Sequence, residues 1–103
     1  MSKFGLYGKL LVKEDDRDKL VSILLEAAES MKNLEECQIY LISTSDEEPN
    51  AVFVYEVWDN EDAHKASLSL ESTQLLIERA KPILTGMENI NTLKISGGKG
   101  ISL

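Results

Sequence analysis

The spacing of apolar positions predicts a chain that opens with a strand and continues as a helix. Residues 4–12 form a short aromatic and aliphatic run that stops at charged residues, as expected of a β-strand. Over residues 13–32, apolar side chains recur at helical spacing, so one stripe of the helix is apolar. Glu14, Asp15 and Asp16 stand where its first turn is expected. Carboxylates there complement the helix dipole and can cap free amides.

The middle of the chain predicts a β-hairpin. Residues 37–44 and 51–59 are apolar and strand-like, and the polar segment between them contains Pro49, which is typical of a turn. Helical character resumes directly afterwards, with Asn60 or Asp59 as the expected N-cap.

The rest of the chain predicts a broken helical region and a last strand. Residues 60–84 carry the helical pattern, with a break expected near residues 70–72 and an end at residues 85–86. Residues 91–95 are the fourth predicted strand. We expect residues 97–103, rich in glycine, to form a flexible C-terminal tail of a single domain spanning residues 1–103.

This order of elements predicts an α+β fold of the ferredoxin-like βαββαβ type, an antiparallel sheet with helices on one face. Side chains alternate between the two faces of a strand. In the third strand, one face carries Val52, Val54, Glu56 and Trp58, and the other carries Ala51, Phe53, Tyr55 and Val57. Both sets are mainly apolar, and helices can cover only one face. We therefore expect a homodimer packed sheet against sheet.

Composition narrows the classes of function. The net charge is −7 without a basic cluster, which disfavours binding to nucleic acid or to anionic membranes. A single cysteine, Cys37, favours a reducing compartment, hence a cytoplasmic protein, and its apolar surroundings favour a small buried side chain. One cysteine and one histidine do not provide metal-ligand spacing. The segment SGGKG lacks the following helix that a phosphate loop requires.

Candidate chemistry gathers in the segment FVYEVWDNEDAH, residues 53–64. Glu56 interrupts an apolar strand and needs a partner, because an isolated buried carboxylate is costly. Trp58 lies on the same strand face and could stack on a planar substrate and donate its indole N–H, or simply fill the core. His64 follows one turn into the next helix and is either a general base or a surface histidine. We expect His64, Trp58 and Glu56 to be the catalytic residues, with Glu56 orienting the imidazole or serving as a structural anchor.

The stretch YEVWDNEDAHKASLSLESTQLLIERAKPILTG, followed by GGKG, resembles the antibiotic biosynthesis monooxygenase family over nearly the whole chain, especially its quinol monooxygenase-like bacterial members. The resemblance implies a small dimeric α+β barrel. It also implies oxidation of quinols or anthrones, small electron-rich aromatics, by molecular oxygen without flavin, metal or any other cofactor. Such a protein must exclude water, help to remove a proton and stabilise an anion.

Three positions qualify the resemblance. Some anthrone-oxygenating relatives carry an Asn four residues before this Trp, where this chain has Val54. In the haem-degrading branch, an Asn and a His stand where this chain has Gly8 and Leu68, so haem oxygenation is disfavoured. We assign Val54, Leu68 and Tyr7 to the substrate-binding residues. Among the tyrosines, Tyr7, Tyr40 and Tyr55 are all weaker candidates, and Tyr55 is expected at the dimer interface.

Two other functions stay open. The same family contains isomerases of small phosphorylated molecules, but these need cationic residues in the pocket, and the helix-side strand face offers none. The second is a ligand-binding or stress-linked module without turnover, which the apolar Val54 favours.

Overall fold

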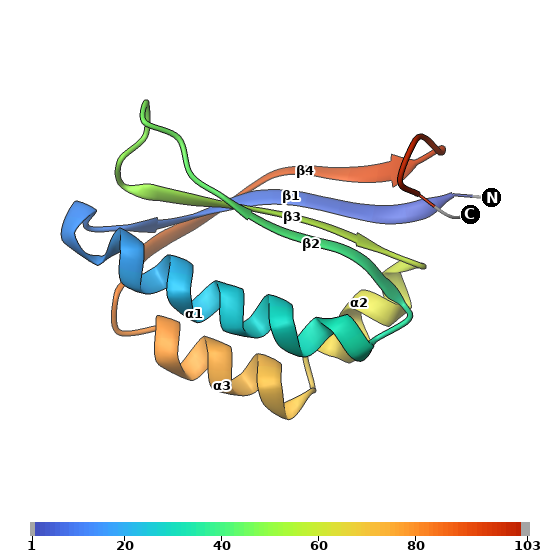
Figure 1. The fold of residues 1–103 in the computed structure, drawn as a ribbon, viewed down its shortest axis with the longest axis horizontal. Helices are drawn as coiled ribbons and strands as arrows, with labels where there is room; N and C mark the ends of the chain where they lie inside the picture. The colour runs from blue at the N-terminus through green and yellow to red at the C-terminus, as the bar shows by residue number, and fades with distance from the viewer. Residues whose placement is uncertain (1, 102–103) are drawn as a thin grey trace.

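A computed structural model describes residues 2–101 of the chain (Figure 1). The elements in chain order are β1 (Lys3–Val12), η1 (Glu14–Asp16), α1 (Arg17–Ser30), η2 (Met31–Asn33), β2 (Cys37–Ser43), β3 (Ala51–Trp58), α2 (Glu61–Ser67), α3 (Glu71–Ala80) and β4 (Leu84–Ile95). The predicted break in the second helical region separates α2 from α3. The predicted hairpin is β2 and β3.

The four strands form one antiparallel sheet in the order β2-β3-β1-β4. All three α-helices lie on the same side of this sheet (Figure 1). The predicted ferredoxin-like α+β fold is therefore confirmed.

The end of the second helical region differs from the prediction. The helix α3 ends at Ala80, and Lys81 donates the last helical hydrogen bond to Ile77. Pro82 has no amide hydrogen to continue the ladder, and its ring clashes with the preceding turn. Residues 85–86, expected to end the helix, lie in β4, where Gly86 pairs with Leu11.

The strand β4 begins at Leu84, well before the predicted residues 91–95. The first part was missed because the alternation of apolar and polar side chains along it is irregular. Its register with β1 shifts between Tyr7 and Gly8, so Asn89 and Asn91 face consecutive β1 residues and Ile90 is an extra residue. Such a bulge breaks the period-2 pattern by which a strand is recognised in a sequence.

The two predicted helix starts have different outcomes. The acidic residues Glu14–Asp16 form the 3-10 turn η1, and neither η1 nor α1 has a side-chain cap. The predicted capping role of these carboxylates is therefore not found. At α2 the prediction is confirmed, because the Asn60 side chain accepts a hydrogen bond of 2.8 Å from the Ala63 amide.

The core lies between the sheet and the helices in two clusters. The larger joins the sheet to α1 and α3 and contains Val12, Leu20, Leu24, Val52, Val54 and Ala80. The smaller consists of Met31, Trp58 and Ala63 and lies where β3 meets α2. The two clusters thus hold the three helices over one face of the sheet.

The opposite face of the sheet, here called the open face, carries aromatic and aliphatic side chains. The Tyr7 ring stacks on Phe53 with centroids 6.2 Å apart and meets Tyr55 edge-on at 6.1 Å. The open face is defined by Tyr7, Leu41, Phe53, Tyr55, Leu93 and Ile95. These six side chains are half-buried or exposed. Both faces of the sheet are thus apolar, as the alternation in β3 predicted.

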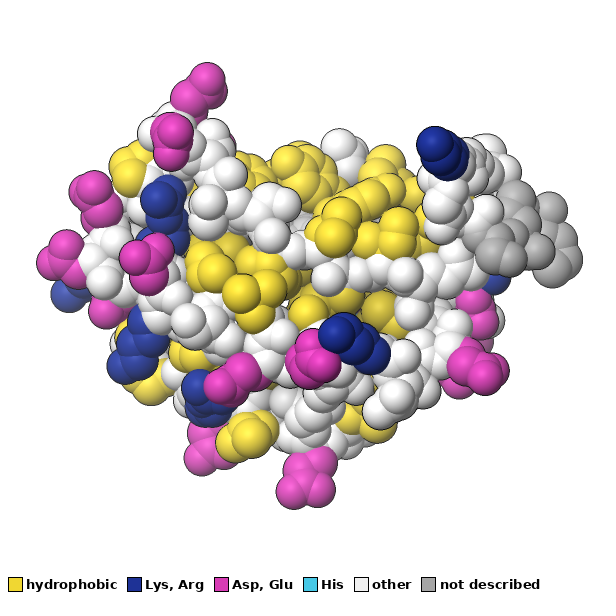
Figure 2. Space-filling view, in the orientation of Figure 1, with side chains coloured by type: hydrophobic (Ala, Val, Ile, Leu, Met, Phe, Trp, Pro, Cys, Tyr) yellow, Lys and Arg dark blue, Asp and Glu magenta, His cyan; other side chains and the backbone are white. Residues whose placement is uncertain are grey.

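Charged side chains are dispersed over the surface. In Figure 2 they lie mainly toward the margins of the view, while hydrophobic side chains gather in its middle. No helix within residues 2–101 is long and apolar enough to span a membrane.

The predicted C-terminal tail is described only in part. Residues 97–101 belong to no helix or strand, and Ile101 donates a backbone hydrogen bond to Gly98 in a turn. Residues 102–103 lie outside the described part of the chain. The flexibility of this segment stays a prediction.

Candidate active site

A cavity of about 710 Å³ lies between the helix-side face of the sheet and the helices. Strands β1, β3 and β4 supply one wall, and α2 and α3 supply much of the other. Its lining is mostly apolar and includes Leu6, Leu10, Leu24, Val54, Leu76 and Met87. This volume and composition are typical of a site for a small organic ligand.

Glu56, Trp58 and His64 all line this cavity. Alternation in β3 places Glu56 and Trp58 on the same face, and the Trp58 indole N–H donates a hydrogen bond of 2.9 Å to Glu56 Oε1. Trp58 is only 1% exposed. The expected role of its N–H as a free donor to substrate is therefore not available in this arrangement, because Glu56 occupies it.

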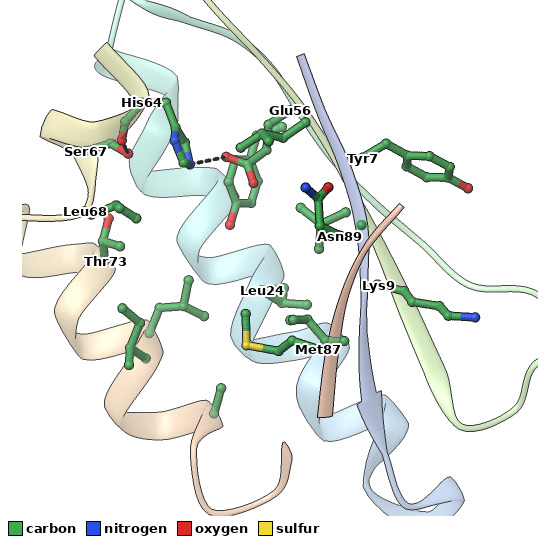
Figure 3. Close-up of a pocket in the computed structure, with 18 of the residues that line it drawn as sticks. Tyr7, Lys9, Leu24, Glu56, His64, Ser67, Leu68, Thr73, Met87 and Asn89 are labelled. Atoms are coloured by element: carbon green, nitrogen blue, oxygen red, sulfur yellow. Dashed lines mark hydrogen bonds and ion pairs between the residues drawn. The ribbon is translucent and has the colours of Figure 1, made fainter. Parts of the chain in front are cut away.

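His64 reaches the cavity because α2 begins immediately after β3. The Asn60 cap starts the helix two residues after Trp58, so the first turn of α2 folds over the end of the sheet. The imidazole then lies against two rings, with centroids 5.7 Å from Phe4 and 5.8 Å from Trp58. Its Nε2 is 3.9 Å from Glu56 Oε1 (Figure 3).

Burial raises the pKa of the Glu56 carboxyl above its ordinary value, and the Trp58 hydrogen bond and the His64 charge oppose this shift. Desolvation disfavours the charged carboxylate, whereas an N–H donor and a nearby imidazolium favour it. The His64 and Glu56 side chains are 19% and 17% exposed, so their interaction takes place largely out of bulk water. The pair can accept and stabilise a proton at the cavity wall.

The three residues assigned to substrate binding occupy different places. Val54 is buried in the wall of the cavity, and Leu68, at the end of α2, is 45% exposed and also lines it. Tyr7 belongs to a lining strand, but its ring points away from the cavity, toward the open face (Figure 3).

Comparison with known proteins gives the family. The profile of the antibiotic biosynthesis monooxygenases matches residues 4–79. The chain belongs to this family. The match begins in β1 and ends in α3, so it includes Glu56, Trp58 and His64. No curated protein matches the sequence significantly.

Several crystal structures are similar to this family member. A candidate antibiotic biosynthesis monooxygenase from Chloroflexus aurantiacus is 33% identical, with 97% of this chain and 99% of that chain covered and a TM-score of 0.80. Another, from Caulobacter crescentus, is 20% identical, with 89% and 91% covered and a TM-score of 0.79. A third, from Deinococcus radiodurans, is 22% identical, with 97% of each chain covered and a TM-score of 0.75. The last two support the fold alone.

The cavity of this family member also contains polar residues beyond those we assigned to the site: Tyr40, which was only a weaker candidate, and Thr73 and Asn89, which were not predicted. Tyr40 from β2 and Thr73 from α3 line it, and Asn89 from β4 lies on its side of the sheet (Figure 3). Thr73 Oγ1 is enclosed and has no hydrogen-bond partner within the described residues. Asn89 was missed because its strand was predicted to start later. Its isolated position in the sequence gave no signal.

Charged groups other than Glu56 and His64 lie at the margin of the cavity. Lys9 points away in Figure 3, and its ammonium pairs with Glu48 at 2.5 Å and Glu88 at 3.4 Å. Lys81, also a lining residue, is exposed just beyond the end of α3. Among residues 2–101, no group of three or more His, Cys, Asp or Glu side chains could hold a metal ion.

Proposed function

We propose that this chain is a monooxygenase that works without a cofactor and oxidises a quinol or anthrone-like aromatic with molecular oxygen. The observation that carries the proposal is the Glu56–His64 pair, 3.9 Å apart, in the wall of an otherwise mainly apolar cavity of about 710 Å³. The apolar walls suit a planar aromatic ligand. The pair supplies the proton chemistry that such a substrate needs before it can react with oxygen.

In this proposal, His64 is the general base. Its Nε2 takes the proton of a substrate hydroxyl, or of a carbon conjugated to an aryl ketone, and Glu56 stabilises the imidazolium that forms. Trp58 positions Glu56 through its indole N–H and does not need to contact the substrate for this role. General acid–base assistance of this kind is worth about 10²–10⁴-fold in rate.

The deprotonated substrate then supplies the electrons. An electron-rich aromatic anion can reduce oxygen directly, and the apolar cavity keeps water away from the reacting carbon. The substrate loses two hydrogens and gains one oxygen atom, which becomes a carbonyl at the methylene carbon of an anthrone or a ring hydroxyl of the quinone formed from a quinol. The second oxygen atom leaves as water with the two hydrogens. Val54 and Leu68 would contact the rings of the substrate, and Tyr7 would contribute only through the backbone of β1.

We also propose that the active form is a homodimer that buries the open face. The support is physical: aromatic and aliphatic side chains cover this face, and the helices lie on the other one. An exposed apolar patch of this kind is typical of a protein–protein contact.

A binding module without turnover is the second candidate function. Two observations favour it: Val54 puts an apolar side chain into the cavity wall, and the 3.9 Å between His64 and Glu56 exceeds a hydrogen bond. An isomerase of phosphorylated molecules is less well supported, because the Lys9 ammonium is engaged by Glu48 and Glu88 away from the cavity.

Oxygen uptake tests the proposal. Protein freed of metal and flavin is offered a panel of hydroquinones and anthrones, beside a His64→Ala variant. We expect uptake above the uncatalysed rate, lowered about 10²-fold or more in His64→Ala. Trp58→Phe should also lower it, because Glu56 then loses its hydrogen bond. Lys65→Ala, an exposed neighbour in the same helix, is the matched control and should keep full activity.

Isotope labelling separates oxygenation from simple oxidation. With ¹⁸O₂, we expect one labelled atom in the product and the other in water. The absence of uptake over the whole panel, from folded protein, would contradict the proposal and favour the binding module. Equal uptake by wild type and His64→Ala would remove His64 from the mechanism.

A further inference from the structure

Tyr40 is a phenol beside the acid–base pair that the mechanism above does not use. It lies in β2, directly opposite Glu56 in β3. Directly paired residues of antiparallel strands share a face, with Cβ atoms about 4.5–5.5 Å apart. The ring packs against both core clusters and lines the cavity. Tyr40 therefore flanks Glu56 on the cavity side of the sheet.

The Tyr40 hydroxyl has no hydrogen-bond partner among residues 2–101. It is also not one of the fully enclosed unpaired atoms, because Thr73 Oγ1 is the single case in this part of the chain. The hydroxyl thus retains accessible surface, and since the ring lies on the helix side of the sheet, that surface opens to the cavity. Tyrosine hydroxyls in such half-buried places usually find a partner, so this one is free to bind a ligand.

The surroundings of the Tyr40 hydroxyl determine its protonation state and therefore whether it acts as a hydrogen-bond donor or as a base. Burial, followed by the nearby charge of Glu56, raises the pKa of the Tyr40 phenol. The group therefore stays protonated at neutral pH and can donate a hydrogen bond, but it is unsuited to act as a base. Glu56 is already bound by Trp58, whose N–H occupies the same Oε1 that faces His64. The Tyr40 hydroxyl is left for the substrate.

We propose that Tyr40 is a catalytic residue that donates its O–H to the substrate oxygen on which negative charge develops. The inference rests on the proposed function, because the charge arises when the Glu56–His64 pair removes a proton. Tyr40 keeps its own proton throughout. Preorganised donors at a developing oxyanion are strong in a cavity of low dielectric.

This role narrows the substrate class. The substrate must carry an oxygen that becomes anionic on loss of one proton, either a phenolic hydroxyl or the carbonyl of an enolisable aryl ketone. The same molecule must place the acidic hydrogen at His64 and this oxygen at Tyr40. An aromatic without such an oxygen would enter the cavity but would not be activated.

Binding of a phenolate probe to the whole chain tests this inference. The probe is 4-nitrophenol at pH 8, where it is mostly ionised and absorbs visible light, and 4-nitroanisole is the analogue that cannot ionise. In Tyr40→Phe we expect affinity for the phenolate to fall about tenfold or more, the scale of a hydrogen bond to a charged group. Affinity for the anisole should stay unchanged. Tyr55→Phe, on the open face, is the matched control and should bind both probes as wild type does.

Folding is checked by the anisole and by thermal unfolding. Because the Tyr40 hydroxyl has no hydrogen-bond partner in the described part of the chain, Tyr40→Phe should unfold at the wild-type temperature. Equal phenolate affinity in wild type and Tyr40→Phe, or equal rates of oxygen uptake, would overturn the role of Tyr40 and leave the proposed function standing. Wild-type protein that neither binds the phenolate nor consumes oxygen would overturn both.

Discussion

Glu56 links the sequence pattern to the chemistry at the scale of single residues. A carboxylate inside an apolar strand must find a hydrogen-bond donor, because burial without one is costly. The donor is the Trp58 indole, two residues along the same strand, and His64 stands farther off at 3.9 Å. Trp58 therefore holds Glu56 in place, while His64 makes no hydrogen bond to it; in the proposed function, this leaves His64 to exchange a proton with the substrate.

The stability of the protein should depend on pH through Glu56. Its folded-state pKa is raised above the ordinary value of 4.5, chiefly by burial. The stability that the protonated group contributes is thus complete below that value and is lost as pH rises through the folded-state pKa. Glutamine does not ionise and can still accept the indole N–H. We expect the free energy of unfolding of Glu56→Gln, relative to wild type, to increase between pH 4 and pH 7 in urea denaturation.

Glu78→Gln is the control for this prediction, because Glu78 is exposed on α3. Its difference from wild type should stay nearly constant over the same pH range. If the free energy of unfolding of Glu56→Gln instead decreases relative to wild type as pH rises, the ionised carboxylate is the form that the fold favours.

The sequence alone could predict that Glu56, Trp58 and His64 lie close together, but not all of their contacts. Alternation placed Glu56 and Trp58 on one face, and helical spacing placed His64 one turn beyond the strand. Which donor Glu56 would use depends on side-chain rotamers, which no periodicity encodes. Tyr40 was only a weaker candidate because its place opposite Glu56 depends on the β2–β3 register, and a register follows from the whole hairpin rather than from the residue itself.

At the scale of elements, the β4 bulge shapes the cavity wall opposite the helices. Val54, Gly8 and Asn89 form one row across β3, β1 and β4. Gly8 has no side chain, and a Cβ built there would lie 2.8 Å from the Glu88 carbonyl oxygen. The close approach of the two backbones therefore depends on glycine at this position.

Gly8→Ala should consequently destabilise the fold. The new methyl group meets a backbone oxygen, which can move only if the bulge itself shifts, and overpacking of this kind costs about 1–3 kcal/mol. Gly86→Ala, elsewhere in the same strand pair, is the matched control. Its Cβ would meet the flexible Leu11 side chain at 3.3 Å, so its effect should stay within about 1 kcal/mol. Urea denaturation of both variants makes the comparison, and equal losses would contradict the importance of the bulge.

The order of elements was predictable because most of them carry one clear period. The helix α1, the β2–β3 hairpin and the capped start of α2 have regular patterns and local signals, and they appear as predicted. The strand β4 has neither, because its bulge interrupts the alternation and most of its side chains are exposed. Its first residues, 84–86, were assigned to the end of the preceding helix, although Pro82 already made that helix unable to continue.

At the scale of the whole molecule, the chain has an apolar sheet face and a net charge of −7. The two features have opposite effects on the free energy of self-association. Burial of aromatic side chains favours a dimer by roughly 25 cal/mol per Å² of apolar surface. Repulsion between two acidic copies disfavours it and weakens as salt screens the charges. The balance predicts a dimer whose affinity rises with ionic strength.

Replacing one exposed leucine on the open face tests this dimer. Leu41 lies opposite Tyr55 and is 54% exposed, whereas Leu25 on α1 is 53% exposed on the helical side of the molecule. We expect wild-type protein to sediment at twice the chain mass of 11.5 kDa, with tighter association at higher salt. Leu41→Glu should raise the dimer dissociation constant about tenfold or more, because it adds a charge to an apolar contact. Leu25→Glu adds the same charge at the same exposure and should leave the constant unchanged. Equal effects of the two substitutions on the dissociation constant would show that net charge, and not the open face, governs assembly. Wild-type protein that stays monomeric at every concentration would contradict the dimer and indicate that the open face binds a different partner.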